Sequence, residues 1–75
     1  MIVSYKKLWK LLIDKNLKKT DLLELANISS DSLAKLEKNE NVTTYVLEKI
    51  CTALKCDIGD IMEMVVSSNE NSNSI

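Results

Sequence analysis

Several residue types that shape protein folds are absent or rare in this sequence. It contains no proline, and Gly59 is its only glycine. Because sandwiches and barrels of β-strands need many turns built from these two residues, their scarcity favours an all-helical domain. No hydrophobic run approaches the ~18 residues of a membrane-spanning helix, so we expect no membrane segment.

Histidine is absent as well. Its absence removes the commonest general base and the commonest metal ligand. The two cysteines, Cys51 and Cys56, do not form a C-x-x-C pair, and helical spacing is expected to place them on different faces. We therefore expect reduced, buried thiols, no metal or other cofactor, no enzymatic activity and a cytoplasmic location.

The 75 residues that are present suit one small soluble domain, with 45% hydrophobic and 28% charged residues. The net charge of −1 is unevenly distributed. Residues 1–20 carry six lysines and one aspartate (+5), residues 21–56 carry four lysines and six acids (−2), and residues 57–75 carry four acids and no base (−4). A basic first part is compatible with a nucleic-acid partner, although a solvated lysine face explains it equally well.

Apolar residues at helical spacing predict five helices. They are expected at about residues 4–16, 19–26, 30–38, 44–55 and 58–64. Ser4, Ser29 and either Thr43 or Thr44 are the expected N-caps. The ordered domain is expected to span residues 1–66, and the polar tail, residues 67–75, is expected to be disordered.

The second and third predicted helices are joined by a very short turn. Asn27 suits a left-handed conformation, and Ile28 is expected to fill the core from within the turn. The apolar residues of this unit occupy the positions that a helix-turn-helix requires: Leu22, Ala26, Ile28, Leu33 and Leu36.

Two longer segments follow the helix-turn-helix pattern. They are "SLAKLEKNE" at residues 32–40 and "VLEKICTALKCDIGDIME" at residues 46–63. Together these features resemble the phage-repressor and Cro type of helix-turn-helix domain, the xenobiotic-response-element family of bacterial regulators, over about residues 5–65. The sequence departs from that family at three positions, where Asn27 replaces a glycine, Leu23 a small alanine and Lys19 a frequent glutamine.

The resemblance implies a compact five-helix bundle of the lambda-repressor-like type whose third helix enters the major groove of double-stranded DNA. Carried over position by position, the residues that would contact bases are Ser30, Asp31, Ala34 and Lys35. The residues that would contact phosphates are Lys19, Ser29 and Lys38, to which Lys10 and Lys15 of the first helix are added.

Some of these residues also have a purely structural interpretation. A Ser-Ser-Asp sequence is what any helix start favours, so Asp31 serves either a base or the helix dipole. Trp9 and Tyr5 are expected to pack at the core and rim of the first helix and not to stack on bases.

The resulting functional hypothesis is a sequence-specific DNA-binding transcriptional regulator, a repressor acting as a homodimer and needing no small-molecule ligand. The dimer is expected to form through an apolar run near the end of the domain: Ile61, Met62, Met64, Val65 and Val66. Met1-Ile2-Val3 is a second apolar run that could join it as a strand. The alternative function is a protein-binding helix-turn-helix module, such as an antitoxin component, which the acidic pI of 5.3 favours.

Overall fold

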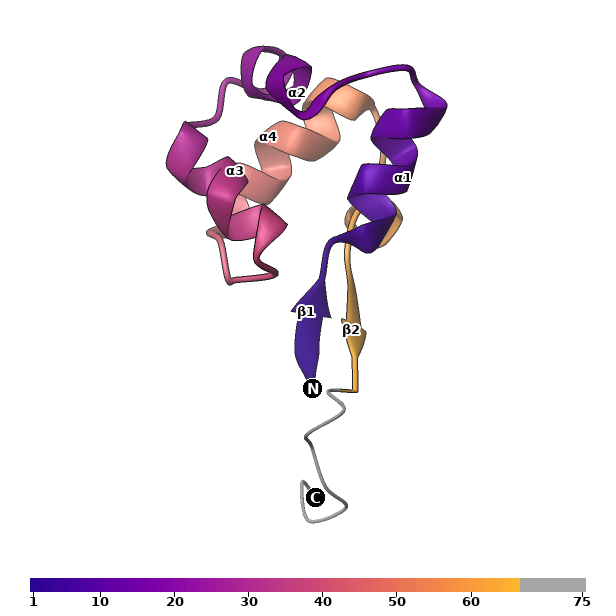
Figure 1. The fold of residues 1–75 in the computed structure, drawn as a ribbon, viewed down its shortest axis with the longest axis vertical. Coiled ribbons are helices and arrows are strands. Elements are labelled where there is room, and N and C mark those ends of the chain that lie inside the picture. Colours follow the sequence, from indigo (N-terminus) through magenta and orange to yellow (C-terminus); the bar gives the residue numbers. More distant parts are fainter. Residues whose placement is uncertain (67–75) are drawn as a thin grey trace.

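The computed structural model describes residues 1–66, so the predicted disorder of residues 67–75 lies outside the described residues. Within residues 1–66, four α-helices and a two-stranded sheet make up the fold (Figure 1). In chain order they are β1 (Ile2–Ser4), α1 (Lys6–Asp14), α2 (Lys19–Ala26), α3 (Ser30–Glu37), α4 (Thr44–Leu54), the 3₁₀-helix η1 (Ile58–Asp60) and β2 (Glu63–Val65). The helices form one body, and the two strands extend from it side by side.

All four α-helices end in the same way. The residue after each helix, or one further on, adopts a left-handed conformation: Asn16 (φ 58°), Asn27 (φ 54°), Asn39 (φ 57°) and Lys55 (φ 55°). The amide of the following residue then bonds to a carbonyl five residues earlier, as in Ile28 N–H to Leu23 O at 3.2 Å. This is the Schellman arrangement, for which glycine is the usual residue. A chain with one glycine uses asparagine three times instead, because asparagine tolerates this conformation better than most residues.

Side-chain caps begin two of the helices. The Ser29 hydroxyl accepts a hydrogen bond from the Ser32 amide at 3.1 Å, and the Thr43 hydroxyl accepts one from the Val46 amide at 3.3 Å. The prediction for Ser4 is wrong. Ser4 is the last residue of β1, and α1 begins at Lys6 after Tyr5, which makes no side-chain cap.

The expected fifth helix at residues 58–64 is replaced by the single turn of η1 and by β2. Asp57 and Asp60 close that turn, because the Asp57 amide donates to the Asp60 carboxylate at 3.0 Å. The chain then pairs antiparallel with β1, placing Ile2 opposite Val65 and Val3 opposite Met64. The all-α prediction is therefore wrong at the ends of the domain, where two short apolar runs satisfy their backbone groups by pairing with each other.

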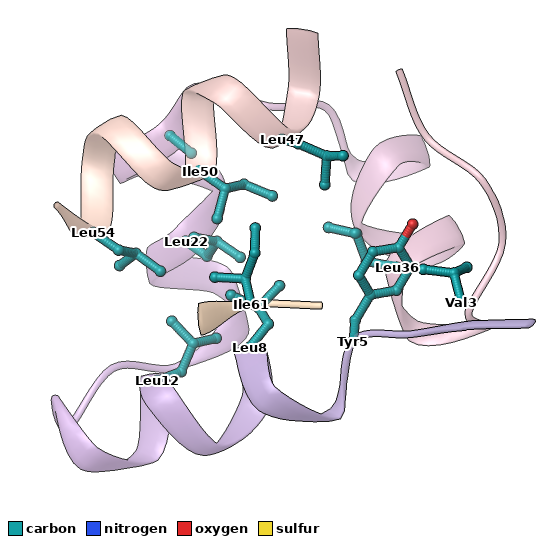
Figure 2. Close-up of a cluster of buried hydrophobic side chains, with 11 residues drawn as sticks. Val3, Tyr5, Leu8, Leu12, Leu22, Leu36, Leu47, Ile50, Leu54 and Ile61 are labelled. Atoms are coloured by element: carbon teal, nitrogen blue, oxygen red, sulfur yellow. The ribbon is translucent and has the colours of Figure 1, made fainter. Parts of the chain in front are cut away.

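The core lies where the helices and the start of the sheet converge (Figure 2). Its buried members come from every element except η1 and β2: Val3, Tyr5, Leu8, Leu12, Leu22, Ala26, Leu36, Leu47, Ile50 and Leu54, with Ile61 from the turn between those two elements. Ile28 and Leu33 are partly buried and pack against this cluster, as the helix-turn-helix pattern requires.

Tyr5 joins the sheet to the end of α3. Its side chain is buried, and its hydroxyl donates to the Glu40 carbonyl at 2.9 Å. Its backbone amide donates to the Asn39 side-chain oxygen at 3.1 Å. Burial raises the pKa of the Tyr5 phenol above its ordinary value. The residue between β1 and α1 thus holds the loop that follows α3.

Candidate nucleic-acid interface

The α2–turn–α3 unit has the predicted form. Helix α2 ends at Ala26, α3 begins at Ser30, and Asn27 makes the left-handed turn between them. The turn is held from the other side by α4, because the Lys49 ammonium donates to the Asn27 carbonyl at 3.0 Å. The same ammonium lies over the ring of Tyr45, 4.6 Å from its centre. The first of these contacts ties the turn between α2 and α3 to α4.

The outer face of α3 carries the residues expected at DNA bases. With Leu36 fully buried and Leu33 half-buried, helical spacing turns Ser30, Asp31 and Lys35 outward, and all three are exposed. Ala34 is half-buried and lies at the margin of this face. The Asp31 carboxylate lies in the first turn, near the positive end of the helix dipole, while Ser29 supplies the cap.

The residues expected at phosphates fall into two groups, and the first group lies around α3. Ser29 and Lys38 flank α3 at its two ends, and both are exposed. Lys19, at the first position of α2, lies nearby but is already engaged. Its ammonium is 3.0 Å from a Glu37 carboxylate oxygen and 4.5 Å from the centre of the Trp9 ring.

Lys10 and Lys15 lie elsewhere. They line a surface hollow with Lys7 and with the segment from the end of α4 to η1. In Figure 1, α1 and α3 lie on opposite sides of α4. Trp9 points from α1 towards Lys19, and at 100° per residue Lys10 projects well away from that direction. The structure does not bring Lys10 and Lys15 together with the exposed face of α3.

Glu37 and Trp9 are the residues of this region that the sequence analysis missed as functional candidates. Glu37 lies 18 positions from Lys19, and no local spacing connects residues so far apart. Trp9 was expected to pack at the rim of α1, and it is indeed partly buried against the core. Its additional contact with Lys19 depends on how three helices meet.

The two cysteines lie together, contrary to the prediction of different faces. The chain leaves α4 at Lys55, and the Cys56 amide bonds back to the Cys51 carbonyl at 3.0 Å. Both residues are partly buried against the core, close enough for each thiol to affect the pKa of the other. Burial, followed by the neighbouring Cys56, raises the pKa of the Cys51 thiol to about 11. Burial also raises the pKa of Cys56.

Other kinds of site are not visible in residues 1–66. No group of three or more histidine, cysteine, aspartate or glutamate side chains in this part of the chain could hold a metal ion. Within the same residues, no helix has both the length and the apolar character needed to cross a membrane.

Comparison with known proteins agrees with this architecture. The chain belongs to the family of Cro/C1-type helix-turn-helix DNA-binding domains, whose model matches residues 7–67. It is also similar to a solved structure described as the crystal structure of the transcriptional regulator VanUg, form II. The two share 56% sequence identity with a TM-score of 0.80, over 83% of each chain. A comparison with curated proteins gives no match.

Proposed function

We propose that this protein is a sequence-specific transcriptional repressor that binds its operator as a homodimer, with α3 in the major groove. The observation that carries the proposal is the outer face of α3, whose polar side chains Ser30, Asp31 and Lys35 are exposed and follow a turn that Lys49 of α4 contacts. The VanUg protein, which is similar over most of its length, is named as a transcriptional regulator. Regulation of transcription follows for this chain by analogy.

The chemistry of that face suits base edges in the major groove. Lys35 can donate to O6 and N7 of guanine, Asp31 can accept from N4 of cytosine, and Ser30 can do either. Ala34 offers its methyl group to that of thymine. Lys38, Ser29 and Lys19 would position the helix by contacting phosphates, which carry no sequence information.

The proposed dimer would form through the strands. A single helix-turn-helix reads few base pairs, and two half-sites lie about 34 Å apart on one face of DNA. Within residues 1–66 the sheet has only two strands, so each has an open edge, and such a sheet is marginally stable by itself. Met64 (59%) and Val66 (70%) are exposed there, with Ile2 (46%) beside them, whereas Met62 and Val65 are partly buried.

Ile61 is not part of the proposed dimer interface, although it was expected there. Its side chain is fully buried in the core of its own protomer, so it has no surface to offer a second copy. Further along the run 61–66, Met64 and Val66 are exposed. We place the contact on Met64 and Val66, in the strand and just beyond it.

Selection of sites from a random pool of duplex DNA tests the DNA-binding part of the proposal. On the selected site, Lys35→Ala should reduce affinity by about 1–3 kcal/mol and relax the preference at one position of each half-site. Lys38→Ala should weaken binding to all sequences alike. Lys10→Ala is the matched control, since Lys10 lies away from α3, and it should change affinity little.

Two outcomes would contradict DNA recognition by α3. One is a selection that enriches no sequence. The other is Lys35→Ala behaving like Lys10→Ala on the enriched site. If α3 binds DNA, the logarithm of the association constant should fall by about 0.9 per contacted phosphate for each unit rise in the logarithm of the salt concentration. Binding to a protein partner with an affinity that does not depend on salt, in place of DNA binding, would favour the antitoxin-like alternative.

Sedimentation at micromolar concentration tests the dimer. Met64→Asp should convert a wild-type dimer into a folded monomer, because it places a charge in an apolar contact. Ile13→Asp is the matched control, since Ile13 is 72% exposed on α1, and it should leave the dimer intact. A wild type that stays monomeric both alone and on DNA would refute this part of the proposal.

A further inference from the structure

Three helices contribute to one small polar cluster beside the proposed DNA-binding face. Lys19 begins α2, Glu37 ends α3 and Trp9 lies in α1. The Lys19 ammonium is 3.0 Å from a Glu37 carboxylate oxygen and 4.5 Å from the centre of the Trp9 ring. Lys19 is also the residue that the family resemblance assigns to a DNA phosphate, so its positive charge has two possible anionic partners.

The ion pair between Lys19 and Glu37 lies at the surface and can be broken at little cost. The side chains of Lys19 and Glu37 are 47% and 43% exposed, so water and ions reach both charges. Exposed ion pairs of this kind contribute little to stability. The DNA backbone, in contrast, offers a dense row of phosphates and releases counterions when a lysine binds. A phosphate arriving at the start of α2 can therefore replace the carboxylate.

We propose that Glu37 is an internal competitor of DNA for Lys19: the carboxylate holds the ammonium in the free protein and yields it to a phosphate in the complex. The inference rests on the proposed DNA-binding function and deepens it. Trp9 provides the apolar platform that limits where the ammonium can move, because its ring covers one side of that group. Glu37 thus lowers the affinity for the DNA backbone whatever its sequence.

The test is a double-mutant cycle on a short duplex of random sequence, where phosphate contacts supply essentially all of the binding. Glu37→Gln keeps the shape of the side chain and removes its charge, so it should tighten binding about two- to fivefold. Lys19→Ala should weaken binding and make its salt dependence shallower by about one phosphate contact. In the Lys19→Ala background, Glu37→Gln should lose most of its effect.

Glu48→Gln is the charge-matched control. Glu48 is exposed on α4, so this substitution removes the same negative charge at a place away from Lys19. It should leave affinity almost unchanged. Far-ultraviolet circular dichroism, together with thermal melting, confirms that every variant is folded before its affinity is compared, because Trp9 emission itself responds to the loss of Lys19.

The outcomes separate the two proposals. A wild type that binds no duplex even at low salt contradicts the DNA-binding function itself. If the wild type binds DNA but Glu37→Gln is no tighter than Glu48→Gln, the competition is refuted and the DNA-binding function stands. Competition is equally refuted if Glu37→Gln tightens binding to the same degree with and without Lys19.

Discussion

Asn39 is the residue at which a substitution separates two physical effects most cleanly. It follows α3 in a left-handed conformation, with φ of 57°. Its side-chain oxygen also accepts the backbone amide of Tyr5 at 3.1 Å, joining the end of α3 to the start of α1. Tyr5 is only 1% exposed, so water cannot readily replace that acceptor.

Three substitutions at this position should differ in the free energy of unfolding. Asn39→Asp keeps both the acceptor and the tolerance of the left-handed conformation, so its effect should be small. Asn39→Gly keeps the conformation but leaves the Tyr5 amide without a partner, at a cost of about 1–3 kcal/mol. Asn39→Ala loses the same hydrogen bond and adds about 1–2 kcal/mol for a Cβ in the left-handed region.

Thermal unfolding followed by circular dichroism measures this order. In a domain of this size, 1 kcal/mol corresponds to about 4–8 °C in Tm. We therefore expect Tm to fall by at least about 4 °C for Asn39→Gly and further for Asn39→Ala. A glycine variant as stable as the wild type would refute the role of the hydrogen bond. An aspartate variant as unstable as the alanine variant would refute the assignment of the side-chain oxygen as the acceptor.

Two further predictions concern the end of α4. Within residues 1–66, Lys55 is the one left-handed residue that is not asparagine (φ 55°). Lys55→Gly should therefore remove about 1–2 kcal/mol of backbone strain, partly offset by the flexibility of glycine, and raise Tm in the same melting assay. An unchanged or lower Tm would contradict this. The raised pKa values of Cys51 and Cys56 mean that the folded protein binds these protons more tightly than the unfolded chain. Their contribution to stability is therefore complete below pH 9.0 and lost as the pH rises towards about 11. Denaturant titrations over this range should show a smaller loss of stability for Cys51→Ala than for the wild type, and equal losses would contradict the assignment.

Helix limits and caps follow from local sequence. Ser29 and Asn27 were predicted in the positions that they occupy, because a cap or a left-handed turn needs only a suitable residue beside the last turn of a helix. The inward-facing residues of α3 also follow from sequence, since helical periodicity sets which side chains share a face. The exposed candidates Ser30, Asp31 and Lys35 were accessible to sequence reasoning for the same reason.

Contacts between distant segments were decided only by the tertiary structure. Residues 58–64 were predicted to form a helix, but Glu63–Val65 pair with β1, some sixty residues away, and form a strand beyond the buried Ile61. Lys10 and Lys19 are both exposed lysines on helices, yet only Lys19 lies beside Glu37. Periodicity tells which way a side chain points from its own helix, but which partner it meets depends on how the helices cross, and that angle is set by the packing of the whole core.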